Sequence, residues 1–309
     1  MKAFWTIKRK LLLFSLCVTL IPLSVITAIY YVSARKEIAH QINHKMIAVA
    51  ESKKLHIEAF LNEIKTRSLD FSSDGYIRSR LEKSVLEGPL NQDAITDLNK
   101  HLKSNKIPLD PDIAAITVLD LTGTVVASTA ESVIGEDFSD REEYVNIIDK
   151  NRNEVLTYPP HFSEYLDHNV VEVSAPITSM KSGEIIGIII NAYNQEIINR
   201  ITSNRKGMGD SGEVVVGLID GDSIKFINTL RYAPDDSFTL KVPLNEEIAK
   251  PMKLALEGHT GTIIGPDYRH IDVIAAYNYV SSVGWGLVAK MDKTEAFQPL
   301  NTLRNTAII

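Results

Sequence analysis

The chain has 309 residues, of which 44% are apolar and 23% charged, and this composition is typical of a folded protein large enough for two domains. Its net charge of −6 argues against a nucleic-acid partner, because nucleic-acid-binding proteins carry a basic surface that neutralises phosphates. The single cysteine, Cys17, excludes an intrachain disulfide and a zinc site built from cysteines.

The first predicted element is a transmembrane helix at residues 11–34. No charged side chain lies between Lys10 and Arg35, and a helix of this segment would be about 36 Å long, enough to cross a bilayer. Basic residues precede it, so we expect residues 1–10 in the cytoplasm and everything after Arg35 outside. A signal peptide cleaved after Ala34 is the alternative, but the apolar stretch is longer than such signals usually are. The sequence therefore predicts a single N-terminal anchor in the cell membrane.

A long helix and its connection are predicted for residues 35–110. Between Lys36 and Leu69 there is no glycine or proline, and apolar residues recur at helical spacing. The rest, up to Pro108, is polar and favours helix. We expect the long helix to pack along the domain that follows. Because it continues the anchor, it is also a mechanical route for a signal.

Residues 111–204 predict a first module, an antiparallel sheet with a helix on one side. Two short strands flank Thr122-Gly123, which is typical of a hairpin turn. The apolar residues of Asp140–Lys150 favour a helix, with Tyr144 on its apolar face. Three more strands are expected, at Glu154–Tyr158, Val170–Ile177 and Glu184–Asn191.

Residues 205–293 repeat this order of elements more weakly. A hairpin around Asp220-Gly221-Asp222 is followed by a helix at Leu244–Glu257, and then by strands at Gly261–Ile264, Ile271–Tyr279 and Trp285–Met291. Together the elements predict an α+β fold in which a transmembrane helix and a long amphipathic helix precede two tandem antiparallel-sheet modules. Residues 294–309 are predicted to form an exit helix. Their uncharged end, Asn305–Ile309, is expected to begin a second membrane segment that leads to a cytoplasmic output module.

Three stretches carry a resemblance to a known family. They are Asp137–Tyr144 (DFSDREEY), Val171–Ile177 with its SAPI motif followed by Gly183–Asn191, and Gly284–Lys290 followed by Glu295-Ala296-Phe297 and Pro299. In this order they resemble the double-Cache family of extracytoplasmic sensor domains. The resemblance implies two PAS-like modules with ligand sensing in the membrane-distal one, a homodimer, and a histidine kinase, diguanylate cyclase or chemoreceptor signalling module in the cytoplasm.

The resemblance also implies a ligand site in the distal module. Arg141 opens the helix of that module, and its guanidinium suits capture of a carboxylate, although an ion pair with Asp140 or Glu142 would explain it equally well. Tyr144 and Tyr158 would supply aromatic walls or simply pack in the core. The remaining candidates lie on nearby elements, and alternation alone does not decide which of them point inward: His161, Glu172, Ser174, Asn191 and Tyr193.

Two positions depart from the pattern of amino-acid-sensing members of the family. Glu143 stands where those members carry a tryptophan, and Asn191 stands where they carry an aspartate that pairs with the ligand ammonium. Because a neutral amide does not neutralise an ammonium group, these departures favour a carboxylate without an amine or another kind of ligand. We expect a small polar molecule that bears a carboxylate, an organic acid or an amino-acid-like compound.

Catalysis is not expected. Gly209-Asp210-Ser211-Gly212 matches a short protease string, but no histidine and aspartate stand in a supporting context. The eight histidines do not have the spacing of a helical metal motif, so we expect neither a metal nor a cofactor. The sequence predicts a ligand-sensing region of a transmembrane receptor. The alternative is a structural or protein-interacting ectodomain without a small-molecule ligand.

Overall fold

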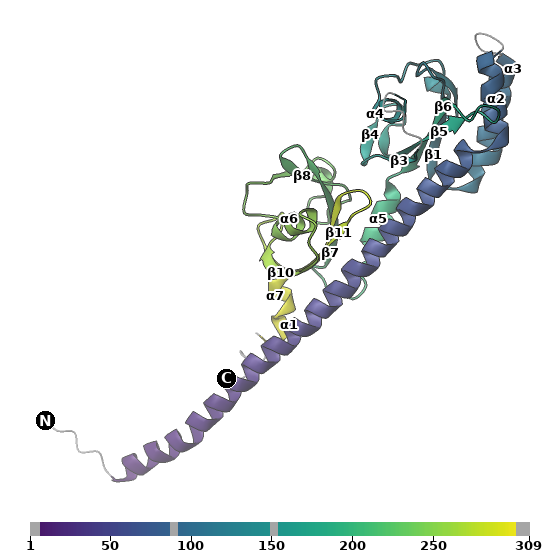
Figure 1. Ribbon diagram of the computed structural model, residues 1–309. Helices are drawn as coiled ribbons and strands as arrows, with labels where there is room; N and C mark the ends of the chain where they lie inside the picture. The colour runs from purple at the N-terminus through teal and green to yellow at the C-terminus, as the bar shows by residue number, and fades with distance from the viewer. Residues whose placement is uncertain (1–6, 87–91, 149–153, 301–309) are drawn as a thin grey trace.

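The computed structural model describes residues 7–86, 92–148 and 154–300 (Figure 1). Its first element, α1 (Ile7–Ser72), is one unbroken helix of 66 residues, which corresponds to a length of about 100 Å. The predicted anchor and the predicted amphipathic helix are thus parts of one continuous helix. Its N-terminal part is long and apolar enough to cross a membrane, and none of the most apolar stretch is buried. The predicted second membrane segment at Asn305–Ile309 lies outside the described residues.

The polar connection after α1 folds into two helices at the far end of the molecule, α2 (Gly75–Leu86) and α3 (Gln92–His101). Asp74 begins α2, because its carboxylate accepts hydrogen bonds from the backbone amides of Tyr76 and Ile77 at 2.9 and 3.0 Å. Two short helical turns, Leu102–Lys106 and Ile107–Leu109, then lead to the first strand.

The first sheet has six antiparallel strands in the order β2-β1-β6-β5-β3, with β4 paired to β5. The hairpin of β1 and β2 turns at Gly123, whose φ of +86° favours glycine. A helix was predicted at Asp140–Lys150, but the structure has only the single turn α4 (Glu142–Val145) in this segment. The last two residues of the predicted helix, Asp149 and Lys150, lie outside the described residues. The strand bounds are Ile113–Leu119 (β1), Val125–Ser128 (β2), Leu156–Thr157 (β3), His161–Ser163 (β4), His168–Thr178 (β5) and Ile185–Asn194 (β6).

The helix α5 (Glu196–Ser203) connects to a second sheet of six antiparallel strands in the order β10-β11-β12-β7-β8-β9. Two helices belong to this module, α6 (Lys250–Leu256) and α7 (Lys293–Ala296). The predicted start of α6 at Leu244 is too early, because Ala249 lies in the left-handed region with a φ of 51°. The strand bounds are Glu213–Asp220 (β7), Ser223–Phe226 (β8), Lys241–Pro243 (β9), Gly261–Pro266 (β10), Asp272–Val280 (β11) and Trp285–Asp292 (β12).

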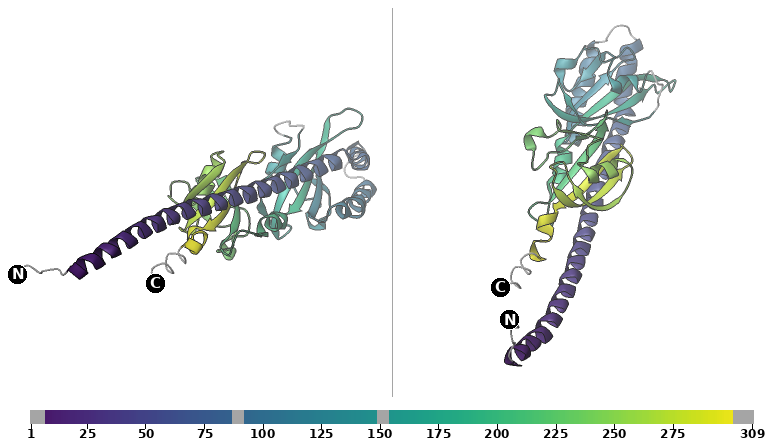
Figure 2. Two further views of the ribbon diagram at one scale, coloured as in Figure 1. Left: turned by 90° about the horizontal axis from the view of Figure 1, so that it is seen from below. Right: turned by 90° about the vertical axis from the view of Figure 1, so that its left-hand side faces the viewer.

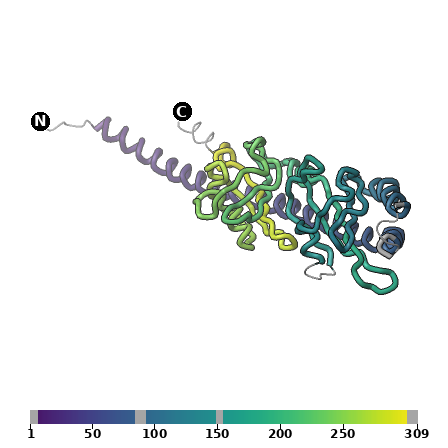
Figure 3. Tube along the Cα trace, turned by 90° about the horizontal axis from the view of Figure 1, so that it is seen from above, coloured from purple at the N-terminus to yellow at the C-terminus, as the bar shows by residue number. Residues whose placement is uncertain are grey.

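The two modules lie one after the other along α1, with the second sheet nearer the apolar end of the helix (Figures 1 and 2). One hydrophobic core joins them, since Ile57, Leu61 and other residues of α1 pack together with both Val173 of the first sheet and Leu287 of the second. Each sheet carries its own helix on the opposite face, α4 on the first and α6 on the second. A tube trace seen from above shows the same sequential placement (Figure 3). These sheets and helices confirm the predicted α+β class.

Candidate functional site

The alternation of side chains along β5 directs two polar residues away from α1. Val171 and Val173 belong to the core against α1, whereas Glu172 and Ser174 between and beside them face the opposite side, where α4 lies. Both are fully buried. The side of the sheet covered by α4 therefore carries the buried side chains of Glu172 and Ser174.

Arg141, at the residue before α4, reaches over this face. Its guanidinium lies 3.2 Å from the Glu172 carboxylate and 3.5 Å from that of Glu143, and it stacks on the ring of Phe138 at 4.5 Å and near that of Tyr165 at 5.6 Å. Burial acts to lower the pKa of Arg141, but the two carboxylates raise it above its usual value. The guanidinium is thus charged and fixed in orientation by its neighbours.

Two buried carboxylates, those of Glu143 and Glu172, meet beside Arg141. Their exposed fractions are 5% and 0%. Burial and the charge of Glu172 raise the pKa of Glu143 to about 7. Burial would likewise raise the pKa of Glu172, but a hydrogen bond with His161 and the charge of Arg141 hold it below its usual value. Tyr165 donates a hydrogen bond to Glu172 at 3.1 Å, and burial raises the pKa of this phenol.

His161 on β4 completes the polar cluster. Its Nε2 atom lies 3.4 Å from Glu172, and its Nδ1 atom lies 3.2 Å from the carbonyl oxygen of Pro159. The hydrogen bond with Glu172 raises the pKa of His161, against the lowering effect of burial. Tyr158 is close by, with its hydroxyl 3.2 Å from that of Ser174.

The structure brings six of the eight predicted site residues to one side of the first sheet, and it places two elsewhere. Asn191 donates to the Ser68 hydroxyl at 2.8 Å, and Tyr193 donates to the Ile64 carbonyl at 3.5 Å, so both face α1. Tyr144 lies on the α4 side but packs in the core there, and its hydroxyl donates to the Leu121 carbonyl at 2.7 Å.

Two cavities border Arg141. One, of about 670 Å³, is lined by Phe138, Tyr165 and the β4 strand. The other, of about 440 Å³, is lined by Glu143, Tyr158 and His161 of the first module and by the β7–β8 hairpin of the second. Phe138 and Tyr165 were not predicted as site residues. Phe138 stands within the DFSDREEY motif, whereas Tyr165 comes from the turn between β4 and β5, which carried no signal in the sequence.

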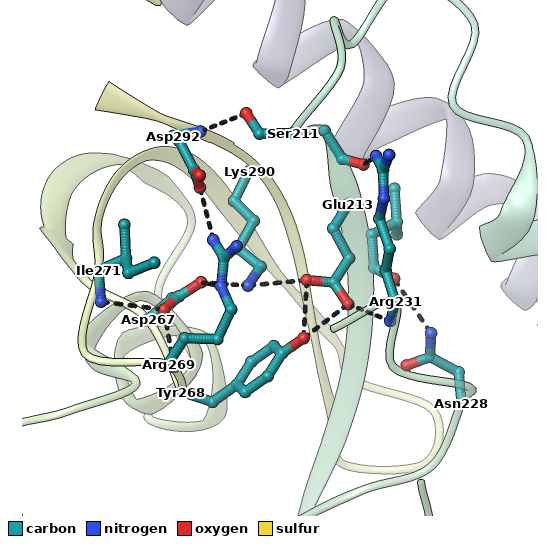
Figure 4. A network of polar contacts seen from close by, with 12 residues as sticks. Ser211, Glu213, Asn228, Arg231, Asp267, Tyr268, Arg269, Ile271, Lys290 and Asp292 are labelled. Atoms are coloured by element: carbon teal, nitrogen blue, oxygen red, sulfur yellow. Dashed lines mark hydrogen bonds and ion pairs between the residues drawn. The ribbon is translucent and has the colours of Figure 1, made fainter. Parts of the chain in front are cut away.

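The second module carries a buried network of charged side chains near α6 (Figure 4). The ammonium of Lys290, 2% exposed, lies 2.8 Å from Glu213 and also pairs with Asp267. Tyr268 donates to Glu213 at 2.9 Å, and Arg269 pairs with Asp267 at 2.7 Å. Only about 10 Å³ of space remains beside this network, about enough for one water molecule. Arg141 in the first module therefore has the roomier surroundings.

Comparison with known proteins gives one family and several similar folds. The Cache domain family model matches residues 33–300. The sensor domain of the Vibrio cholerae histidine kinase DctB is similar, with a TM-score of 0.59, 16% identity and coverage of 82% of this chain and 98% of that one. The sensory domain of the Campylobacter jejuni chemoreceptor Tlp3 with isoleucine bound has a TM-score of 0.60, 12% identity and coverage of 84% and 96%. The ligand-binding domain of Mlp24 with asparagine has a TM-score of 0.57 and 16% identity, with coverage of 87% of this chain and 99% of that one. No curated protein matches the chain significantly.

Proposed function

Because this chain belongs to the double-Cache family of receptor sensor domains, we propose that it binds a small polar, carboxylate-bearing ligand in the distal module, the one built on β1 to β6. It would signal across the membrane in which α1 anchors it. Modules of this family sense ligands and do not catalyse reactions, so any catalytic output would reside in a cytoplasmic part of the receptor.

The observation that carries this proposal is the position of Arg141. Its guanidinium borders both cavities and is held by aromatic rings and carboxylates. A fixed, charged fork of this kind binds a carboxylate through two parallel hydrogen bonds. Glu172 already occupies part of the fork, so a ligand carboxylate would share it or displace Glu172 from it.

The ligand class that fits is an organic acid or an amino acid. Asn191 faces α1 and not the cavities, so its neutral amide does not argue against an amine in the ligand. Glu143 and Glu172 place negative charge close to Arg141, and this charge would attract an ammonium group of a ligand. The bound isoleucine of Tlp3 and the bound asparagine of Mlp24 show that similar folds accept amino acids.

The route to the membrane would be α1, which packs on both sheets and continues into the apolar segment. A ligand moves such a receptor only by binding one of its conformations more tightly than the other. We further propose that two copies associate along α1. Uncharged residues follow a heptad spacing on its exposed side, two leucines, two alanines and three polar residues, namely Ala48, Ser52, Leu55, Ala59, Asn62, Thr66 and Leu69. We call these seven residues the α1 seam.

The test is a binding screen with the 309-residue chain in detergent. Organic acids, amino acids and amines are added, and thermal stability and binding heat are recorded for the native chain, Arg141→Gln and Arg205→Gln. Arg205 is the matched control because it is exposed and lines a different groove, between the modules. We expect a carboxylate to bind the native chain and the control, and about 10- to 100-fold more weakly to Arg141→Gln. If no compound binds, the distal module would instead be a protein-interacting ectodomain.

A further inference from the structure

The cluster beside Arg141 brings three potential metal ligands together. A carboxylate oxygen of Glu143, the Nε2 atom of His161 and a carboxylate oxygen of Glu172 all lie within 4.8 Å of one another. They come from α4, β4 and β5, which explains why the spacing of histidines along the chain did not reveal them. Among the described residues, only Arg141 and His161 form ion pairs with the two carboxylates.

The orientation of His161 is the second observation. A carbonyl oxygen only accepts hydrogen bonds, so the contact with Pro159 requires that Nδ1 carry a hydrogen. In the neutral ring the lone pair of Nε2 then points at the Glu172 carboxylate, 3.4 Å away. Two electron-rich atoms at this distance repel each other unless a proton or a cation lies between them. A backbone carbonyl on Nδ1 is also the usual device that presents Nε2 to a metal.

The distance between His161 and Glu172 agrees with coordination, and an oxygen of Glu143 lies within 4.8 Å of both. In a tetrahedral site with bonds of about 2.1 Å, neighbouring ligand atoms are roughly 3.4 Å apart, and in an octahedral site roughly 3.0 Å. The distance between His161 Nε2 and Glu172 lies in this range. The second cavity, which Glu143 and His161 line, gives a cation a way in.

We propose that Glu143, His161 and Glu172 form a binding site for one first-row transition-metal dication, of the class of Zn²⁺ or Mn²⁺. An imidazole nitrogen with two carboxylates suits these ions better than Mg²⁺ or Ca²⁺, which favour oxygen ligands. The second module shows how the fold otherwise separates two buried carboxylates, because there the Lys290 ammonium lies between Glu213 and Asp267 (Figure 4).

Metal binding would also change the charge around the guanidinium of Arg141. With both carboxylates ionised and His161 neutral, which are the forms that bind a metal, these groups and the guanidinium have a summed charge of about −1, which a dication would turn to about +1. The guanidinium would then be less tightly held by Glu172 and better able to accept a ligand carboxylate. This consequence rests on the proposed function, whereas the metal site does not. By linkage, a carboxylate ligand and the metal should raise each other's affinity by the same factor.

The experiment uses the 309-residue chain in detergent, without a polyhistidine tag and freed of metal with EDTA. All variants carry His40→Gln and His44→Gln, because these two rings on α1 lie 4.3 Å apart at a spacing of four residues and would bind metal themselves. Zn²⁺, Mn²⁺, Mg²⁺ and Ca²⁺ are titrated by calorimetry, and bound metal is counted by mass spectrometry after dialysis. We expect one Zn²⁺ or Mn²⁺ per chain, and much weaker binding of the other two ions.

The variants His161→Gln and Glu143→Gln should each weaken metal binding at least tenfold. His168→Gln is the control, since this histidine is on β5 but bonds to the Leu166 carbonyl. Melting curves of the metal-free proteins show whether each variant is folded. Equal metal binding in His161→Gln and the control, or no binding of any dication, would overturn the proposal. If an organic ligand still requires Arg141 in the metal-free chain, the sensor proposal stands even when the metal site fails.

Discussion

The face of the sheet on which a buried polar side chain lies determines which groups it contacts in each module. Glu172 and Asn191 are both buried polar residues on central strands, yet Glu172 lies beside Arg141 and Asn191 bonds to Ser68 of α1. In the second module Lys290 lies between two carboxylates, and a space of only about 10 Å³ remains beside it. Whether a module has room for a ligand therefore depends on a few buried ionisable residues.

Removal of the buried ammonium should destabilise the second module strongly. Lys290→Met leaves Glu213 and Asp267 facing each other without their shared cation, and loss of one partner from a buried ionic cluster costs about 3–5 kcal/mol. Urea unfolding of the native and variant chains measures this change. Lys241→Met, which removes an exposed ion pair with Asp220, is the control and should change stability little. A similar effect of both substitutions would contradict the role given to Lys290.

The same network should make stability depend on acid pH. Burial alone would raise the pKa of Asp267, but Lys290 and Arg269 hold it below its ordinary value of 3.8. Because the folded state keeps this carboxylate charged to lower pH than the unfolded chain does, its contribution is fully present above about pH 5 and is lost as the pH falls through the folded pKa. The free energy of unfolding between pH 5 and pH 2 should thus fall less steeply in Asp267→Asn than in the native chain. Parallel curves would show that other carboxylates cause the acid sensitivity.

At the scale of whole elements, α1 has two distinct long faces. One face is buried against both sheets, and the other carries the α1 seam, in which Leu55 and Leu69 are 58% and 55% exposed. Large apolar side chains that recur in a heptad pattern are typical of helices that pair with a second helix. The fold of a single copy does not need this seam.

Charged residues in the seam should prevent dimer formation. The double variant Leu55→Glu, Leu69→Glu would place like charges opposite each other in a paired helix, and we expect it to be monomeric where the native chain is dimeric. Light scattering after size-exclusion chromatography, corrected for detergent, gives the mass. Leu121→Glu is the control, because Leu121 is 44% exposed and belongs to the turn between β1 and β2, outside α1. A native chain that is itself monomeric, or a double variant that stays dimeric, would rule out dimer formation through the α1 seam.

Sequence patterns predicted the hairpins and the long strands well and the site only in part. β5, β6, β11 and β12 are long and rich in apolar residues, so their positions were predicted within a few residues. The short strands β4 and β9 have three residues each, too few for a periodic signal. Both faces of the first sheet are buried, so alternation could not show that Asn191 and Glu172 face opposite ways. The cluster of Glu143, His161 and Glu172 joins residues of separate elements, and no local pattern encodes it.

At the scale of the whole molecule, polar bonds tie the two modules together around α5. Gln195 donates to the Ile227 carbonyl at 2.7 Å, Asn199 accepts from the Thr229 amide at 2.7 Å, and Lys53 of α1 donates to the Ile201 carbonyl at 2.6 Å. Each of these bonds relates a side chain to the backbone of another element. The modules are therefore expected to unfold and move as a unit.

Without these bonds, the two modules should unfold in separate transitions. In Gln195→Leu, Asn199→Ala, two backbone groups lose their partners, at a cost of about 1–3 kcal/mol each where they are buried. Calorimetry should then show two transitions where the native chain shows one, and a distal ligand should raise only one of them. Asn204→Ala, at an exposed position just after α5, is the control. A single transition in the double variant would mean that the shared core on α1 suffices to couple the modules.

The unbroken course of α1 also limits how such a receptor can change in evolution. Each residue added to a helix turns everything beyond it by about 100°, and seven residues restore the original direction to within about 20°. An insertion between the apolar segment and Met46, where the buried face of the helix begins, would rotate both modules about the axis of the membrane segment. Natural relatives with longer or shorter stalks are therefore expected to differ in steps of about seven residues, and other lengths to be eliminated by selection.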